Sequence, residues 1–249
     1  MKETDQYFDG IADKFARNIY GTTKGRLRHI LLLDAMQPFL QARRHQIIEL
    51  GGGTGILTKA LVEQDHHVTL TDASEQVLEL ARELLAPYPD VNVWQVPLQD
   101  IEHLSSYSMV ICHAVLEWLA EPFEALTHIS EKMAPGSLLS LSFFNRDAAL
   151  FGNAVYGNFA YIAKGLKVKN QVRLNPDNAL RPAQVIDYLQ ALGFTIEAKA
   201  GIRCFHDYMN DKPQSDDKFA ELLDAERQYG KQEPFCWLGK YFYLMLRKT

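Results

Sequence analysis

Cysteine and long apolar runs are both scarce in this sequence. Only three cysteines occur among 249 residues, namely Cys112, Cys204 and Cys236. A sparse, odd set of this kind predicts neither a disulfide framework nor a zinc site, and Cys112 and Cys204 lie in apolar runs typical of buried thiols. No apolar run approaches the roughly 20 residues that a membrane-spanning helix needs. Neither a disulfide-linked protein nor one that contacts a membrane is therefore expected.

An excess of positive charge is absent too. The formal net charge is −5, which excludes a broadly basic surface for non-specific nucleic-acid binding but leaves room for a local basic patch. Residues 1–13 are polar and lack the apolar segment of a secretory signal, and we expect a cytoplasmic protein. The length suits a single α/β domain over residues 1–249.

The sequence does contain a regular alternation of short apolar runs and helical segments. Strands are expected at residues 45–49, 68–71, 91–96, 109–113 and 138–144, with helices at 56–64, 75–85 and 122–133 between them. Further along, a strand is expected at 194–200, a helix at 216–229 and a last strand at 241–246. Because such alternation places helices on both faces of a parallel sheet, it predicts a doubly wound α/β fold with a mostly parallel sheet of seven strands.

Two segments interrupt this alternation. Residues 1–39 contain one amphipathic stretch, at 26–39, and we expect an N-terminal helical lid there. Residues 145–180 form an insertion after the fifth strand, and we expect this insertion to bind substrate. It is rich first in aromatic residues and then in cations: Phe151, Tyr156, Phe159, Tyr161, Lys164, Lys167, Lys169 and Arg173.

A glycine-rich turn from Gly51 to Gly55 follows the first expected strand and opens a helix. Glycine lets the backbone turn sharply and lets a ligand approach closely, while the helix N-terminus presents free N–H groups. The glycines fall at every second position, unlike those of a dinucleotide-binding turn, and Glu49 precedes them. A carboxylate at that point suits the cationic amino group and sulfonium of S-adenosylmethionine better than it suits a pyrophosphate.

Polar residues follow the next expected strands. Asp72 lies about 20 residues beyond the turn, where a carboxylate can accept both hydroxyls of a ribose. Asp100 follows the third strand and suits the amino group of an adenine, and His113 ends the fourth strand, where ligands bind in such sheets. Alternatively, Asp72 caps the following helix, Asp100 lies in a solvated turn, and His113 is bonded to the backbone.

Two family resemblances rest on these and other residues. Glu49 to Gly55, Asp72 and Asp100 resemble motifs of the class I S-adenosylmethionine-dependent methyltransferases over about residues 45–145. That resemblance implies a Rossmann-like fold and a donor that leaves as S-adenosylhomocysteine, and it does not identify the acceptor. Nearly the whole chain is similar to the bacterial tRNA 5-carboxymethoxyuridine methyltransferases, in blocks at residues 11–15, 18–25, 113–118, 157–159, 203–208, 232–235 and 238–241.

The second resemblance implies methyl transfer to the carboxylate of 5-carboxymethoxyuridine at the tRNA wobble position, which gives the methyl ester 5-methoxycarbonylmethoxyuridine. A guanidinium at Arg28 suits the donor's carboxylate because it can bind both oxygens. The family's turn has Asp-Ala where this chain has Glu49-Leu50, which keeps the carboxylate. Matched by position, the donor contacts implied are Arg28, Gly51, Gly52, Asp72, Gln99, Asp100 and His113.

A carboxylate acceptor is already an anion at neutral pH, so a general base is not needed. The sequence accordingly offers no convincing Ser-His-Asp or Cys-His arrangement. A cation is needed to hold such an acceptor, and Arg203 and His206 are the main candidates. Alternatively, Arg203 forms a surface ion pair with Asp207 or Asp211. Further candidate cations are Lys14, Arg17 and Lys24.

The anticodon loop of a tRNA is single-stranded, and proteins read such loops by stacking and edge contacts. Candidate stacking platforms, unless they are core or lid aromatics, are Tyr20, Phe144, Phe151, Tyr156 and Tyr161. With the resemblance, the four cations from Lys164 to Arg173 indicate a patch for tRNA phosphates rather than a solvated loop. Two other classes stay open: a methyltransferase for a small-molecule acid, with residues 145–180 only as a lid, and a protein that binds the donor without methyl transfer. No obligate protein partner is expected.

Overall fold

Seven strands form the central sheet of the computed structural model, which describes Asp5, residues 22–166 and residues 178–249. Neighbouring strands are parallel except around β7, which runs antiparallel to both of its neighbours. The predicted doubly wound, mostly parallel sheet is therefore confirmed. In sheet order the strands are β3 (Asn92–Gln95), β2 (His67–Asp72), β1 (Gln46–Leu50), β4 (Met109–His113), β5 (Leu138–Phe144), β7 (Tyr241–Lys248) and β6 (Phe194–Ile202).

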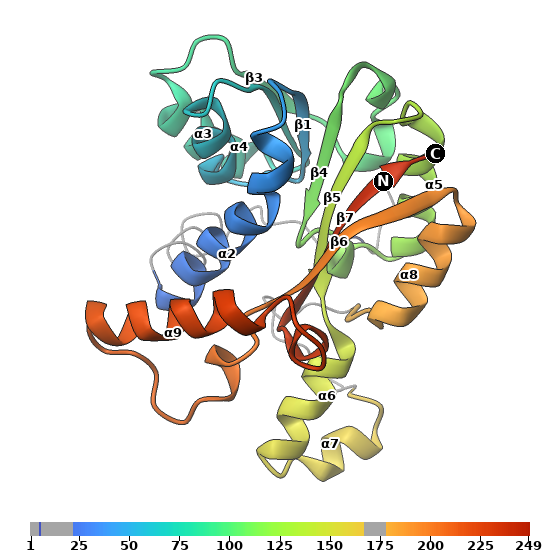
Figure 1. Cartoon of the computed structure of the whole chain (residues 1–249). Coiled ribbons are helices and arrows are strands. Elements are labelled where there is room, and N and C mark those ends of the chain that lie inside the picture. Colours follow the sequence, from blue (N-terminus) through green and yellow to red (C-terminus); the bar gives the residue numbers. More distant parts are fainter. Residues whose placement is uncertain (1–4, 6–21, 167–177) are drawn as a thin grey trace.

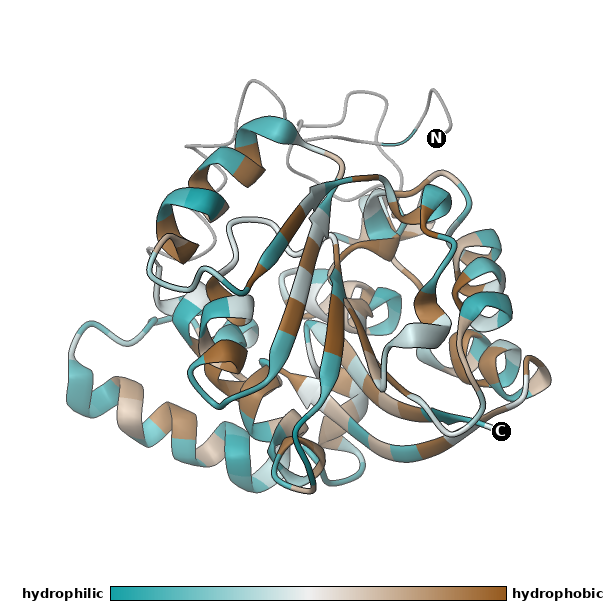
Figure 2. Cartoon of the chain, turned by 90° about the horizontal axis from the view of Figure 1, so that it is seen from above, coloured by the Kyte–Doolittle hydropathy of each residue, from teal (hydrophilic) through white to brown (hydrophobic). Residues whose placement is uncertain are grey.

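Helices cover both faces of this sheet, and the central strands are apolar along most of their length for that reason. Met109 to Cys112 of β4, for example, are all fully buried. Hydrophobic residues run along the strands and along the helix faces turned towards them (Figure 2). One side carries α2 (Thr23–Leu40), α3 (Ile56–Val62), α4 (Glu75–Leu85) and α9 (Asp216–Tyr229), and the other carries α5 (Pro122–Lys132) and α8 (Pro182–Ala191) (Figure 1).

Helix α2 packs against the sheet and contributes to the core. It begins after Thr22, whose hydroxyl accepts a hydrogen bond from the Gly25 N–H at 3.2 Å, as an N-cap residue does. Leu27 and Met36 on its inner face are fully buried. Residues 23–39 are therefore part of the core and do not form a lid. The residues before α2, where a lid is still expected, lie outside the described residues apart from Asp5 and Thr22.

The insertion after β5 is helical. It contains α6 (Arg146–Val155) and α7 (Phe159–Ala163), which project away from the edge of the sheet (Figure 1). Asn145 caps α6 through its side-chain oxygen and donates from its amide nitrogen to the carbonyls of Trp237 and Gly239, so the root of α6 is tied to the segment before β7. Lys167, Lys169 and Arg173 lie outside the described residues. None of the described helices combines the length and the hydropathy needed to cross a membrane.

Candidate active site

The glycine turn, Gly51 to Gly55, is shaped by three left-handed backbone conformations. Gly51, Gly53 and Gly55 have φ of +64°, +61° and +78°, which explains why glycine recurs at every second position. A Cβ on Gly51 would lie 2.6 Å from Val115 Cγ2, and one on Gly52 would lie 2.8 Å from Leu70 Cδ1. The turn therefore leaves no room for side chains at the carboxyl end of β1.

Asp72, at the end of β2, ties this turn to the neighbouring strand. Its Oδ2 accepts a hydrogen bond from the Gly53 N–H at 3.0 Å, and its Oδ1 accepts one from the Ser74 N–H at 2.9 Å. Ser74, not Asp72, caps α4, since its hydroxyl accepts from the Val77 N–H. Each carboxylate oxygen can accept more than one hydrogen bond, so the arrangement is compatible with additional bonds from ribose hydroxyls.

Glu49 lies beneath the turn and not at its open side. Its side chain is buried, and Oε2 accepts a hydrogen bond from Thr58 Oγ1 at 2.5 Å. Burial raises the pKa of Glu49 to about 7, with the nearby Asp72 charge adding to the rise and the Thr58 hydrogen bond opposing it. Its contact with the turn indicates support of the backbone conformation, since a Cβ on Gly52 would lie 2.9 Å from Glu49 Cδ.

His113 ends β4 at the same edge of the sheet. Its Nε2 lies 2.8 Å from Ser140 Oγ, while its buried Nδ1 has no hydrogen-bond partner within the described part of the chain. Burial, followed by the positive charge of Arg28, lowers the pKa of His113 to about 3, so the imidazole is neutral at pH 7. An unpaired ring nitrogen next to the glycine turn is a position suited to a ligand atom.

The remaining predicted donor residues come from α2 and from the short helix η1 (Leu98–Asp100). Arg28 donates from Nη1 to the Tyr241 hydroxyl at 3.4 Å. Gln99 donates to Asp5 Oδ2 at 3.1 Å, and Asp5 Oδ1 also accepts from the Ala120 N–H at 2.8 Å. Asp100 is exposed on η1. The predicted residues thus gather along the carboxyl ends of β1 to β4, which we term the donor edge.

A second group of charged residues lies where β5 ends, β6 ends and β7 begins. Arg203 is buried, has a φ of +63°, and donates from Nε and Nη2 to the two oxygens of Asp207 at 2.7 and 2.8 Å. The Arg203–Asp207 pair considered from sequence is therefore present, but it is buried and bidentate. His206, also buried, has Nδ1 at 3.4 Å from Asp207 Oδ2. Burial of Asp207 is outweighed by hydrogen bonds from His206 and Arg203, which hold its pKa below the usual range.

Tyr241, the first residue of β7, joins the two groups. The guanidinium carbons of Arg28 and Arg203 lie 5.3 and 5.6 Å from its ring centroid. Lys240 precedes it, with Nζ 4.7 Å from the ring centroid of Phe144. No role for Lys240 or Tyr241 follows from the sequence alone, although both belong to an unusual sequence block. We term Lys24, Arg203, Asp207 and Lys240 the cationic cluster.

Other predicted residues lie elsewhere. Lys164 is exposed at the C-terminal end of α7, outside the donor edge and the cationic cluster, while Lys14, Arg17 and Tyr20 fall outside the described residues. Cys112 and Cys204 are free, buried thiols, as predicted. Within the residues described, no three His, Cys, Asp or Glu side chains are grouped to hold a metal ion.

Comparisons with known proteins identify the fold. Residues 48–139 match the model of a methyltransferase domain. A Synechocystis magnesium protoporphyrin IX methyltransferase solved with bound S-adenosylhomocysteine superposes with a TM-score of 0.64 at 18% identity, over 98% of this chain and 96% of that one. A Thermotoga maritima S-adenosylmethionine-dependent methyltransferase, described as a possible histamine N-methyltransferase, gives 0.64 at 15% identity, over 97% and 98%. Fold and site define a class I S-adenosylmethionine-dependent methyltransferase.

Sequence similarity identifies the family within this class. The tRNA 5-carboxymethoxyuridine methyltransferase of Escherichia coli (strain K12) is 38% identical over 252 aligned positions, which cover 98% of this chain and 97% of that relative. This chain belongs to the tRNA 5-carboxymethoxyuridine methyltransferase family.

Proposed function

We propose that this enzyme transfers the methyl group of S-adenosylmethionine to the carboxylate of 5-carboxymethoxyuridine at the wobble position of tRNA. The product is the methyl ester 5-methoxycarbonylmethoxyuridine. The full-length similarity to a tRNA 5-carboxymethoxyuridine methyltransferase supports this acceptor. We further propose that the donor is held by Arg28, Gly51, Gly52, Asp72, Gln99, Asp100 and His113.

The reaction needs no proton transfer by the protein, because a carboxylate acceptor is already ionised. S-adenosylmethionine, when bound, supplies an electrophilic methyl group on a sulfonium. The donor edge is unsuited to a base: the pKa of His113 is lowered to about 3, and burial raises the pKa of the Cys112 thiol. The residues of this chain therefore act by aligning the two partners and excluding water from them.

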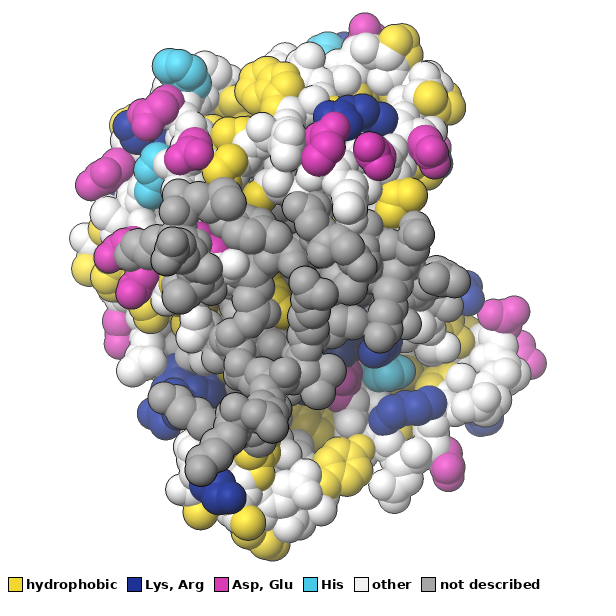
Figure 3. Space-filling view, turned by 180° about the vertical axis from the view of Figure 1, so that it is seen from behind, with side chains coloured by type: hydrophobic (Ala, Val, Ile, Leu, Met, Phe, Trp, Pro, Cys, Tyr) yellow, Lys and Arg dark blue, Asp and Glu magenta, His cyan; other side chains and the backbone are white. Residues whose placement is uncertain are grey.

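One observation favours a tRNA over a small acid. Of the six large hydrophobic residues exposed in the described chain, five lie on α6, α7 and the turn between them, and Phe159 is 67% exposed. Hydrophobic side chains gather at that end of the molecule (Figure 3). Unstacked bases bind to such aromatic surfaces. We term the five the exposed apolar ridge: Leu150, Phe151, Val155, Tyr156 and Phe159.

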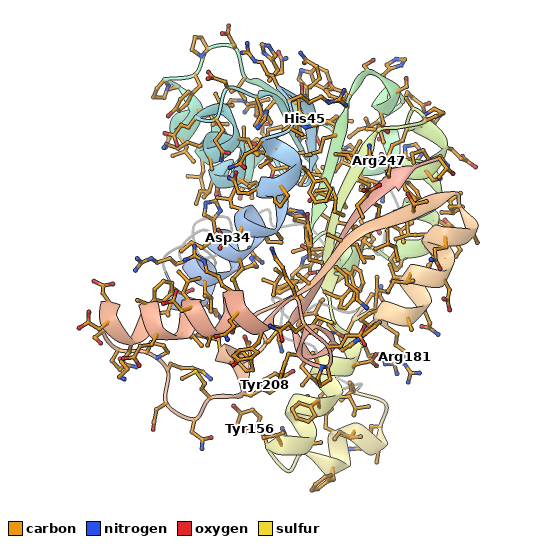
Figure 4. The ribbon with its side chains drawn as sticks, in the orientation of Figure 1. Asp34, His45, Tyr156, Arg181, Tyr208 and Arg247 are labelled. Carbon is orange, nitrogen blue, oxygen red and sulfur yellow. The ribbon has the colours of Figure 1, made fainter. Side chains whose placement is uncertain are left out.

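The exposed apolar ridge begins at the cationic cluster. Tyr156 donates from its hydroxyl to the Asp207 carbonyl at 3.1 Å, and the rings of Phe151 and Tyr208 meet edge to face with centroids 5.2 Å apart. Tyr156 and Tyr208 lie close to each other beside α6 (Figure 4). A nucleotide with its carboxylate at the cationic cluster would thus have apolar surface next to it for the neighbouring bases.

We also propose that the four cations between residues 164 and 173, the basic segment, bind tRNA phosphates. Neutralising phosphates releases counterions, so each contact steepens the fall of affinity with salt. Replacing all four cations of this segment by Ala is expected to weaken tRNA binding and to reduce its salt slope. An unchanged affinity and slope would remove these residues from the interface: Lys164, Lys167, Lys169 and Arg173.

The acceptor is tested by incubating the enzyme and S-adenosylmethionine with tRNA that bears 5-carboxymethoxyuridine, followed by nucleoside mass spectrometry. We expect a gain of one methylene unit on that nucleoside and none on tRNA that lacks the carboxymethoxy group. Methylation of small carboxylic acids without methylation of the tRNA would instead show that this is a small-molecule enzyme. Donor binding without any methylated product would contradict methyl transfer altogether.

A further inference from the structure

The cationic cluster is a local excess of positive charge in an acidic protein. The chain as a whole has a net charge of −5. The charges that act on Lys240 are those of Asp207, Arg203 and Lys24, so three cations share one carboxylate. Arg203 also donates from Nη1 to the Lys24 carbonyl at 3.5 Å, which places the start of α2 against this group. With one carboxylate for three cations, the cluster has room for a further anion.

Arg203 is already committed within the cluster. Two of its nitrogens bind both oxygens of Asp207, and the third reaches the Lys24 carbonyl. Binding a second carboxylate through the same bidentate face would require breaking a buried ion pair, which is strongly destabilising. The neighbouring half-buried cation, Lys240, has no such ion pair among the described residues.

Hydrogen bonds of its backbone hold Lys240 in place, while its ammonium has no ion-pair partner among the described residues. Its N–H donates to the Arg203 carbonyl at 3.1 Å, and its carbonyl accepts from the Asn145 N–H at 3.1 Å. Its Nζ lies over the Phe144 ring, and no described residue offers that Nζ a carboxylate or a hydrogen-bond acceptor. Burial lowers the pKa of Lys240; the charge of Asp207 opposes this fall, and the charges of Arg203 and Lys24 add to it.

We propose that the ammonium of Lys240 binds the carboxylate of the acceptor and thereby selects an acidic acceptor. This inference rests on the proposed function. An ammonium is a point charge and can bind one carboxylate oxygen, whereas a guanidinium fork engages both. The other oxygen then keeps a free lone pair for attack on the methyl group. The Phe144 ring beneath the ammonium limits its approach to the open side of the cluster.

The same contact changes when the reaction is complete. The free carboxylate oxygen forms the new bond to the methyl carbon, and the bond between that carbon and sulfur breaks with its electron pair going to sulfur. The acceptor carboxylate becomes a neutral ester, so the ion pair with Lys240 is lost. Lys240 thus favours the substrate over the product, which promotes release of the methylated tRNA.

The decisive variant is Lys240→Met, which keeps an unbranched side chain, shorter by one atom, and removes its charge. We expect KM for tRNA with 5-carboxymethoxyuridine to rise at least about tenfold, the loss typical of a hydrogen bond to a charged group. Affinity for S-adenosylmethionine and for tRNA bearing the methyl ester should stay within about twofold. Lys240→Arg, which keeps the charge, should recover most of the lost affinity.

A matched control is Lys199→Met. Lys199 also lies over an aromatic ring, with Nζ 4.9 Å from the centroid of Trp237, but it is paired with Glu233. Its replacement should leave KM unchanged. An unchanged KM in Lys240→Met, or an equal loss of affinity for the acid and the ester, would overturn the proposal. If Lys240→Met does not fold, the wild-type enzyme provides the test. The proposal would be overturned if wild type bound tRNA with the methyl ester as tightly as tRNA with the free acid.

Failure of the proposed function has a different signature. In that case the wild-type enzyme itself would not methylate tRNA that bears 5-carboxymethoxyuridine, whatever residue stands at position 240. The inference on Lys240 fails only when the wild type methylates this tRNA and the variants or the ester comparison give the overturning results.

Discussion

The donor edge and the cationic cluster are built in opposite ways. At the donor edge, consecutive backbone from Gly51 to Gly53 lies beside side chains such as Asp72 and His113, which end the parallel strands on either side of β1. The cationic cluster is made of side chains from residues far apart in the sequence, such as Arg203 and Lys240. Under the proposed function, backbone geometry selects the donor and side-chain charge selects the acceptor. The donor edge should therefore tolerate no added atoms, while the cationic cluster should tolerate changes of shape but not of charge.

The largest effect is expected from Gly51→Ala. The added methyl would meet Val115 Cγ2 at 2.6 Å on a backbone with φ of +64°, so the turn must move. We expect donor affinity, measured by calorimetry, to fall by roughly 100-fold or more, the sum of backbone strain and the displaced turn. Gly136→Ala is the matched control, because its φ is +81° and nothing lies within 4 Å of the added Cβ. Equal losses of donor affinity in both variants would show that backbone strain, and not the contact with Val115, causes the loss.

Asp72→Ala tests a side chain that connects the glycine turn to β2. It removes the acceptor for the Gly53 N–H and for the proposed ribose hydroxyls. Donor affinity should fall at least about 20-fold, as for the loss of charged hydrogen bonds, while tRNA affinity without donor stays unchanged. Asp90→Ala, at an exposed position, serves as the control. Unchanged donor affinity in calorimetry would contradict the assignment of Asp72.

Phe159→Ala tests the acceptor side without touching charge. Phe159 is 67% exposed at the start of α7. Loss of one stacked base corresponds to about 1–3 kcal/mol, so we expect tRNA affinity to fall about tenfold with donor affinity unchanged. Trp94→Ala, at a 47% exposed position on the edge strand β3, should have no effect on tRNA binding. A loss shared by both variants would argue against a specific surface on α6 and α7.

The smallest effect concerns stability and pH. The pKa of Glu49 is raised from 4.5 to about 7 in the folded chain. The contribution of protonated Glu49 to the free energy of unfolding is therefore fully present below pH 4.5 and is lost as the pH rises through 7. Glu49→Gln keeps an acceptor for Thr58 and cannot ionise. At pH 8 it should be more stable than wild type by on the order of 1 kcal/mol, measured by urea unfolding. Glu79→Gln, on an exposed face of α4, should keep the wild-type pH dependence, and the same dependence in Glu49→Gln would exclude this explanation.

Much of the fold can be predicted from sequence because burial leaves a clear pattern. The runs at 109–113 and 138–144 coincide with β4 and β5, which are covered on both faces. The edge strand β3 is shorter than the expected 91–96 because only one neighbour pairs with it. The helices of the insertion are not predicted, because much of the apolar surface of α6 and α7 faces solvent.

The site also has a part that can be predicted from sequence and a part that cannot. The glycine turn, Asp72 and His113 are recognisable because parallel strands present their carboxyl ends at one edge. Lys240 precedes a strand, and no local pattern shows that β7 runs in the opposite direction. The engagement of Arg203 by Asp207 also depends on the local backbone, with a φ of +63° at a residue that is not glycine. The sequence predicts a cation here, and only the three-dimensional structure shows which cation has no ion-pair partner in the described part of the chain.

The reversed direction of β7 gives the proposed acceptor contact the stiffness of a sheet. Phe144 and Tyr241 are register partners in the β5–β7 ladder, and the Asn145 N–H donates to the Lys240 carbonyl next to it, so the backbones of Lys240 and Phe144 keep a fixed separation. A flexible loop would adapt to carboxylates on arms of different length, but a residue fixed at the start of a strand favours one length. The enzyme would on this basis act as a ruler for the arm that carries the acid, and a nucleoside with one methylene more or fewer would present its oxygen off the line of attack.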